Sequence, residues 1–184
     1  MRDNCDRNNS TFYERILIMN NASFKYPDQA AYELVTAQLA AKNITYKDIA
    51  VITKELQKQY LPDVPLSEFE AETQDVLHKR EVMNNVMVAL ELDRLATAHE
   101  LKEPLESIIC NDAGVFGVDE GLALNIANIY GTIGVTNYGY VDKVKEGIIK
   151  RLDEEKGDEV NTFIDDIIGA IAAAVAAKMA HKYA

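Results

Sequence analysis

Acidic residues recur in the second half of the chain beside glycine and apolar residues. Asp112 precedes the pair Asp119-Glu120 in a D-x-G-x-x-x-x-D-E pattern, and Asp165-Asp166 opens the most apolar segment. Carboxylates next to apolar residues are costly to bury unless they are paired, hydrogen-bonded or bound to a cation. Mg²⁺ takes one or two carboxylates together with waters and substrate phosphate oxygens, so these residues suffice for a magnesium site that handles phosphate.

A second short pattern places Asp142 three residues before Lys145, within GYVDKVKEG. On a helix, residues with this spacing are neighbours, so a surface ion pair is one interpretation of the two. The acidic pairs also have a structural interpretation, because carboxylates in the first turn of a helix favour its dipole by roughly 0.3–1 kcal/mol. Asp112, for its part, could stabilise a turn through its own side chain. Spacing alone leaves these interpretations open.

Other catalytic signatures are missing from the sequence. Neither Cys5 nor Cys110 is followed six positions later by arginine, and no Asp-x-Asp, GxSxG, HExxH or GxxxxGK[ST] pattern occurs. His78, His99 and His181 lie far apart and have no metal-ligand spacing. Zinc chemistry and covalent nucleophile chemistry are therefore poor candidates.

Composition narrows the possible partners. The 184 residues contain 19 Lys and Arg against 30 Asp and Glu, a formal net charge of −11. Such a surface repels nucleic-acid phosphates, so we expect no nucleic-acid partner and at most peripheral contact with a membrane. With 48% hydrophobic residues, the chain has room for one core, and we predict a single domain over residues 1–184 with a frayed tail at 1–10.

Hydrophobic periodicity indicates an all-α fold of six or seven helices. Strand-like alternation is weak and confined to residues 13–19, and the Gly131, Gly134 and Gly139 cluster predicts a turn or a close helix approach. The predicted helices cover residues 28–42, 45–61, 67–95 (one helix or two, with a break near His78), 104–109, a segment around 122–129, 140–155, and 162 to near the end.

The last predicted helix contains the uncharged run IIGAIAAAVAA, residues 167–177. A membrane-spanning helix needs about 20 apolar residues, so we interpret this run as a central core helix surrounded by the others. No apolar signal segment follows Met1, and we place the protein in the cytoplasm. Because Gly169 would permit close contact between helices of two copies, a homo-oligomer is a further possibility.

Three segments taken together resemble the phosphatidylglycerophosphatase A family. These are NDAGVFGVDEG, NYGYVDKVKEG and TFIDDIIGAIAAAVA, which occur in this order within residues 80–182. The resemblance is to the soluble branch of small proteins that are sometimes labelled low-temperature-requirement C proteins. It implies an all-helical fold and a Mg²⁺-dependent phosphatase that removes the terminal phosphate of phosphatidylglycerophosphate.

By position, the family's acidic motifs fall on six carboxylates, with Lys145 as the basic residue beside them. The six are Asp112, Asp119, Glu120, Asp142, Asp165 and Asp166. As a hypothesis, Asp119, Glu120, Asp165 and Asp166 hold one or two Mg²⁺ ions, and Lys145 neutralises a phosphate oxygen. Either Asp112 or Asp142 would then orient the attacking water.

The chain departs from better-known family members in two ways. Those members are membrane-embedded and have a Gly-Thr-x-Gly-Ser segment near the N-terminus, whereas this sequence has neither an adequate span nor that segment. The first 80 residues look like a different helical arm. Two alternatives therefore stay open, a soluble phosphatase for small phosphomonoesters and a non-catalytic helical assembly or cold-stress protein.

Overall fold

The computed structural model describes residues 24–155, 157 and 159–184. The expected frayed tail and the weak strand pattern at residues 13–19 lie outside these residues. Within them every regular element is a helix, which confirms the all-α prediction. The described part of the chain contains nine helices: α2 (Asp28–Ala41), α3 (Tyr46–Gln57), α4 (Leu66–Leu77), α5 (Arg80–Thr97), α6 (Leu105–Cys110), α7 (Val118–Ile129), α8 (Gly131–Val144), α9 (Gly147–Glu154) and α10 (Ile164–Lys182).

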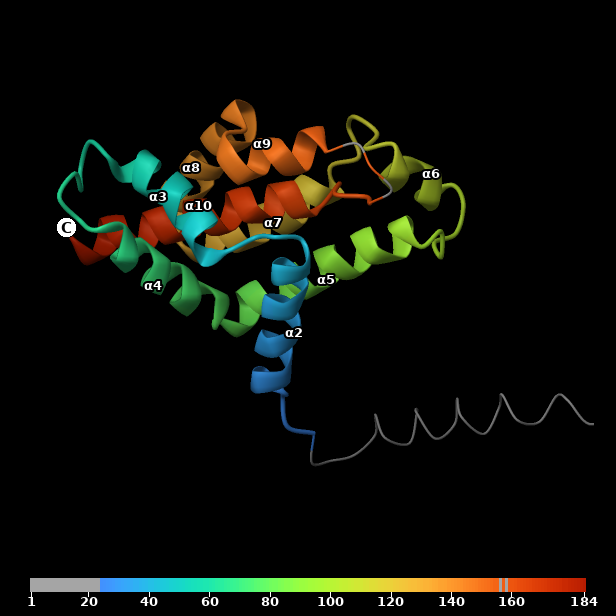
Figure 1. The fold of residues 1–184 in the computed structure, drawn as a ribbon, viewed down its shortest axis with the longest axis horizontal. Helices are drawn as coiled ribbons and strands as arrows, with labels where there is room; N and C mark the ends of the chain where they lie inside the picture. Colours follow the sequence, from blue (N-terminus) through green and yellow to red (C-terminus); the bar gives the residue numbers. More distant parts are fainter. Residues whose placement is uncertain (1–23, 156, 158) are drawn as a thin grey trace, which may run out of the picture.

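Helix α10 lies at the centre of the fold, as predicted. It contacts α3, α4, α5, α7, α8 and α9, which surround it in Figure 1. All of its residues from Ile164 to Ala177 are buried, including its two aspartates. An alanine-rich helix has small side chains on every face, so neighbouring helices can approach it from all sides. Gly169 is part of this packing, with Val141, Ile149 and Tyr138 beside its Cα, and is not available for contact between copies.

Helix α3 packs its apolar face into the core. Thr45 caps its start through a reciprocal capping box with Asp48. Ile49 and Ile52 are buried, and the Thr53 hydroxyl donates to the carbonyl of Ala172 in α10 at 3.2 Å. This apolar face is therefore used for core packing and not for contact with a membrane surface.

The predicted number of helices is too low, partly because a single helix over residues 140–155 is wrong. Helix α8 ends at Val144, and Lys145 adopts a left-handed backbone conformation with φ of 46°. Gly147, with φ of 58°, then begins α9 in a new direction. The α8–α9 corner turns the Lys145 side chain away from the helical position that its spacing from Asp142 suggested.

The glycine cluster serves both purposes that the sequence predicted for it. Gly131, with φ of 76°, forms the turn between α7 and α8, where left-handed backbone favours glycine. Gly134 lies so close to the carbonyl group of Ala127 that a Cβ there would overlap the oxygen. The N-terminal part of α8 therefore packs directly against the end of α7.

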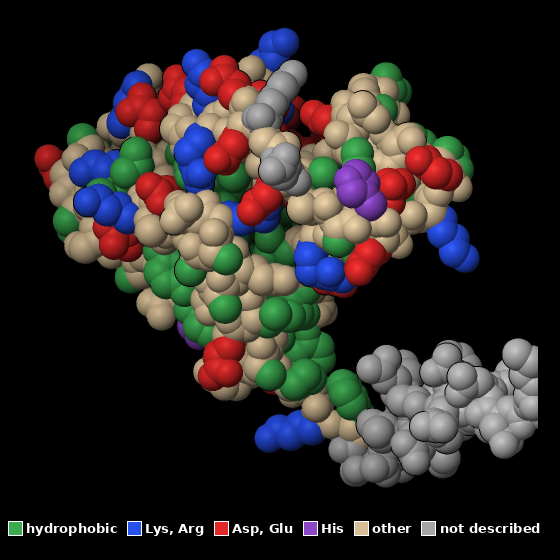
Figure 2. Space-filling model, turned by 45° about the vertical axis from the view of Figure 1, so that its right-hand side comes forward, with side chains coloured by type: hydrophobic (Ala, Val, Ile, Leu, Met, Phe, Trp, Pro, Cys, Tyr) green, Lys and Arg blue, Asp and Glu red, His purple; other side chains and the backbone are tan. Residues whose placement is uncertain are grey.

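The surface mixes both signs of charge. Figure 2 shows acidic and basic side chains interspersed over the face that it presents, with hydrophobic side chains gathered mainly near α2. Among the described residues, no helix is long and apolar enough to cross a membrane. Figure 1 shows α2 projecting from the bundle, where it packs against α5.

Candidate functional site

Three of the predicted metal ligands come together between α7 and α10. Asp119 and Glu120 lie in the first turn of α7, and Asp166 lies in the first turn of α10. One carboxylate oxygen from each residue lies within 4.8 Å of those of the other two. Since α7 and α10 pack against each other, two acidic helix starts that are 46 residues apart in sequence form one group.

Burial makes the two aspartates of this carboxylate group reluctant to ionise. Asp119 and Asp166 are only 5% and 8% exposed. Desolvation raises the pKa of Asp119 to about 7, with a further contribution from hydrogen bonding to Glu120, whose own pKa is lowered by that contact. Desolvation, with Asp165 and Asp142 nearby, raises the pKa of Asp166 to about 8. A cation among these carboxylates would offset this cost.

The group fits a hard divalent cation. All of its ligand atoms are carboxylate oxygens, which Mg²⁺ and Ca²⁺ prefer. In addition, the Oε2 atom of Glu120 is buried and has no hydrogen-bond partner within the described part of the chain. A buried acceptor without a partner is unfavourable, and a coordinated ion is one way to satisfy it.

Helix α8 places Tyr138 and Asp142 near Asp166 of the carboxylate group. The Tyr138 hydroxyl donates a hydrogen bond of 3.1 Å to Oδ1 of Asp166. Asp142, one turn further along α8, is half-buried, and its charge contributes to raising the pKa values of both Tyr138 and Asp166. Asp142 therefore lies close enough to the carboxylate group to influence it electrostatically.

Asp165 faces a different partner from its neighbour Asp166. Its Oδ2 atom lies 3.1 Å from Nζ of Lys145, which also pairs with Asp153 of α9. Desolvation raises the pKa of Asp165 to about 6, although the Lys145 ammonium opposes this shift. Consecutive helical residues point about 100° apart, which explains why the two aspartates have separate surroundings. Lys145 thus pairs with Asp165 and Asp153, and the surface pair with Asp142 that their spacing allowed is not formed.

Asp112 lies apart from the three-carboxylate group. It occupies the loop between α6 and α7, exposed, with a left-handed φ of 45°. It helps to line a cleft of about 750 Å³ that also includes Asp153 and Asp165. Asp112 is therefore at the edge of a cleft that reaches the Lys145 ion pair, not beside Glu120.

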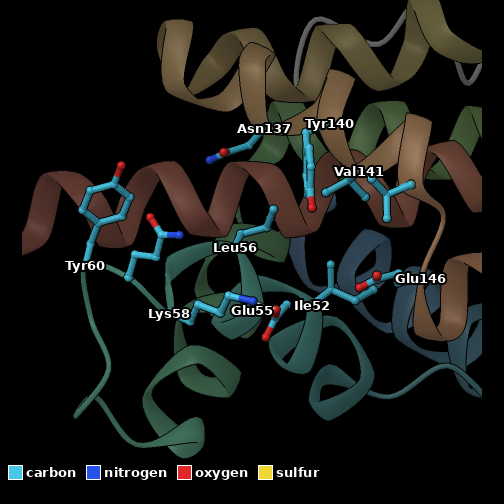
Figure 3. Close-up of a pocket in the computed structure, with 11 residues that line it drawn as sticks. Ile52, Glu55, Leu56, Lys58, Tyr60, Asn137, Tyr140, Val141 and Glu146 are labelled. Atoms are coloured by element: carbon cyan, nitrogen blue, oxygen red, sulfur yellow. Dashed lines mark hydrogen bonds and ion pairs between the residues drawn. The ribbon is translucent and has the colours of Figure 1, made fainter.

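A second pocket, of about 320 Å³, lies between α3 and α8. In Figure 3, Leu56 and Tyr60 approach it from the α3 side, and Tyr140 and Val141 approach it from α8. The pocket contains none of the carboxylates of the site, so we do not assign it to the same chemistry.

Sequence reasoning missed three residues around the site, namely Tyr138, Asp153 and Asp93. Asp93 of α5 is fully buried, and its carboxylate accepts hydrogen bonds from the backbone at the start of α10. Desolvation raises the pKa of Asp93 to about 7, although these hydrogen bonds oppose the shift. A signal existed, because Asp93 continues the buried spacing of Val86 and Leu90 along one helix face.

Comparisons with known proteins identify the family. A sequence model described as phosphatidylglycerophosphatase A matches residues 36–181. The match takes in α3 and α4, which the motifs alone left outside the family-like region 80–182. YutG of Bacillus subtilis (strain 168), an uncharacterized protein, is 46% identical over 146 residues, which cover 79% of this chain and 88% of YutG.

Solved structures share the same fold. A protein of unknown function from Bacillus stearothermophilus has a TM-score of 0.80 and 43% identity, over 88% of this chain and 98% of that chain. The low temperature requirement C protein from Listeria monocytogenes has a TM-score of 0.81 and 47% identity, over 84% and 97% of the two chains. With a family match that spans every helix of the carboxylate group, the chain belongs to the phosphatidylglycerophosphatase A family.

Proposed function

We propose that this protein is a magnesium-dependent phosphatase that removes the terminal phosphate of phosphatidylglycerophosphate or a similar lipid phosphate. The observation that supports it most directly is the group of buried Asp119 and Asp166 with half-buried Glu120, whose Oε2 atom has no partner among the described residues. Hydrolysis of phosphate monoesters is among the slowest uncatalysed reactions, and neutralising the phosphate charge is the main task of its catalysts.

In this proposal the three carboxylates bind one Mg²⁺ ion. When bound, the ion supplies positive charge to the phosphate oxygens. Tyr138 holds Asp166 in place through its hydroxyl. Asp165, which the sequence placed among the ligands, instead orients Lys145 through their 3.1 Å contact. With Asp165 assigned to Lys145, the proposal requires only one of the one or two Mg²⁺ ions that the resemblance allows.

Lys145 is the proposed phosphate-binding residue. The Lys145 side chain is 30% exposed, and its partners Asp153 and Asp165 line the adjoining cleft, so Lys145 can reach a ligand there while it stays paired with Asp165. Burial lowers the pKa of Lys145, but Asp153 and Asp165 outweigh this effect and raise it above the ordinary value. Lys145 therefore stays positively charged at neutral pH and can bind a phosphate oxygen.

Asp142 is the better candidate for orienting the attacking water. It is half-buried on α8 and lies close enough to Asp166 to affect its pKa, whereas Asp112 is exposed on the loop before α7. A group that positions water must lie within hydrogen-bond reach of the reacting centre. We assign Asp112 to the edge of the cleft, where it meets incoming ligands.

A soluble phosphomonoester is the second candidate substrate. The cleft beside Asp165 is lined chiefly by polar and acidic side chains, including Asn161 and Thr162. Such a lining suits a small polar leaving group as well as a lipid headgroup. Contact with a membrane, if lipid is the substrate, would be peripheral and would use surfaces other than the buried face of α3.

The test is Mg²⁺-dependent phosphate release from phosphatidylglycerophosphate in mixed micelles, run beside glycerol 3-phosphate and beside the Asp166→Asn variant. Release from the lipid by the native chain only supports the proposal. Release from glycerol 3-phosphate alone favours the soluble substrate. No release from either substrate by folded protein with Mg²⁺ would favour a non-catalytic helical protein. Co-sedimentation with liposomes separately tests peripheral binding.

A further inference from the structure

Asp93 is a buried carboxylate outside the three-carboxylate group. It lies in α5, with 0% of its surface exposed, and no lysine or arginine forms an ion pair with it among the residues that the structure describes. A buried carboxylate without an ion-pair partner is costly unless hydrogen bonds compensate it. Its position therefore needs an explanation beyond ordinary core packing.

The hydrogen bonds of Asp93 all go to the start of α10. Its Oδ1 atom accepts from the backbone N–H of Phe163 at 3.1 Å, and its Oδ2 atom accepts from that of Ile164 at 3.0 Å. The first N–H groups of any helix lack partners within the helix. The N-cap residue Phe163 provides no side-chain cap of its own. Asp93, 70 residues earlier in the chain, thus provides the cap from another helix.

This cap sets the direction of the site residues. Asp165 and Asp166 are the two residues that follow Ile164, so both lie in the turn that Asp93 holds. A rotation of this turn would move Asp166 away from Asp119 and Glu120, and would move Asp165 away from Lys145. Because α5 also packs against α7, one helix contacts both elements that contribute carboxylates.

The same contacts restrict a different role for this helix start. Free N–H groups at a helix N-terminus can bind phosphate directly. Here the amides of Phe163 and Ile164 already donate to Asp93, so they are not available to a phosphate oxygen. In the proposed site, the cation and Lys145 bind the phosphate.

We propose that Asp93 is a positioning residue of the magnesium site, which holds the first turn of α10 so that Asp166 meets Asp119 and Glu120. This inference rests on the proposed function, since it assumes that the three carboxylates bind Mg²⁺. Residues that support metal ligands from behind typically change metal affinity by about 10–100-fold when they are replaced.

The test measures Mg²⁺ binding by isothermal titration calorimetry for the full chain, Asp93→Asn and a control, Thr53→Val. An asparagine can accept only one of the two N–H groups, and its own amide faces the other. Thr53→Val removes a different buried hydrogen bond to α10, at Ala172 and away from the site. Circular dichroism and melting curves confirm that each variant is folded at the temperature of the titration.

We expect Asp93→Asn to raise the dissociation constant for Mg²⁺ at least about tenfold, and Thr53→Val to leave it within about twofold. Equal affinity of Asp93→Asn and the native chain, or equal weakening by both variants, would overturn the inference. If Asp93→Asn does not fold, Asp93→Glu replaces it, and native Mg²⁺ affinity in that lengthened variant would also overturn it. If the native chain itself does not bind Mg²⁺, the metal of the proposed function fails together with this inference.

Discussion

The ammonium of Lys145 lies 3.1 Å from the carboxylate of Asp165, although the two residues are 20 positions apart and belong to different elements. The contact exists because Lys145 leaves the helical conformation at the end of α8. Asp153 completes the ion-pair network from α9. Asp165, the partner of Lys145, directly precedes the proposed metal ligand Asp166 and lines the cleft. The Lys145 ammonium is therefore oriented before any ligand binds.

Replacing Lys145 should therefore reduce turnover without unfolding the protein. A hydrogen bond to a charged group contributes about 1.5–3 kcal/mol, so we expect Lys145→Met to lower kcat/KM by about 10–100-fold. The control is Lys143→Met, because Lys143 is exposed and forms no ion pair with any described residue. Steady-state kinetics of the phosphatase reaction measures both. Equal activity of Lys145→Met and the control would remove Lys145 from phosphate binding.

Replacing Asp119 should abolish the stabilisation of the protein by Mg²⁺. In the metal-free chain, Asp119→Asn removes a buried carboxyl that is costly to ionise, so we expect its melting temperature at about pH 8 to equal or exceed that of the native chain. The native chain should melt higher when Mg²⁺ is added, and the variant should not. Asp75→Asn is the control, since Asp75 is an exposed carboxylate of α4 that pairs with Lys178. A native-like Mg²⁺ response in Asp119→Asn would rule out Asp119 as a ligand.

The stability of the metal-free protein should fall as the pH rises from about 5 to 8. Burial raises the pKa values of Asp165, Asp119 and Asp166 to about 6, 7 and 8, above the ordinary value of 3.8. Between these limits the folded state binds more protons than the unfolded state, so the free energy of unfolding decreases with increasing pH. The decrease should level off above the highest of these pKa values.

Urea denaturation in EDTA at several pH values measures this effect. Addition of Mg²⁺ should reduce the decrease, because the ion binds the ionised carboxylates of the folded state. A free energy of unfolding that rises from about pH 5 to pH 8 in EDTA would contradict the raised pKa values. The Asp166→Asn variant is the internal control, and its pH dependence should be weaker than that of the native chain.

The close packing of α7 against α8 should be sensitive to one methyl group. A Cβ at position 134 would overlap the carbonyl oxygen of Ala127, so Gly134→Ala should destabilise the protein by about 1–3 kcal/mol. Gly139 lies in the same helix, and a Cβ added there would meet no atom within 4 Å, so Gly139→Ala should stabilise by about 0.4–1 kcal/mol. Thermal or urea unfolding of the two variants compares them directly. Equal stabilities would contradict the close approach at Gly134.

Much of the fold follows from local patterns. The uncharged, alanine-rich run predicts a central helix because no single face of it is polar, and α10 is buried accordingly. Gly131 and Gly134 are interpretable in advance because only glycine tolerates both a left-handed turn and close backbone contact. The acidic pairs Asp119-Glu120 and Asp165-Asp166 can also be singled out from the sequence, since carboxylates beside apolar residues are costly to bury without a partner.

The grouping of those residues depends on long-range packing. Asp165 and Asp166 are adjacent in sequence, yet they face Lys145 and the three-carboxylate group respectively, because α8 and α7 pack on different sides of α10. The spacing of Asp93 places it on the buried face of α5, but its partner is evident only when the start of α10 is placed against it. Local sequence indicates most of the helical segments and the buried central helix, but not the corner at Lys145 between α8 and α9. The partner of each carboxylate is set by helix packing, since contacts between residues that are 20 to 70 positions apart leave no periodic signal in the sequence.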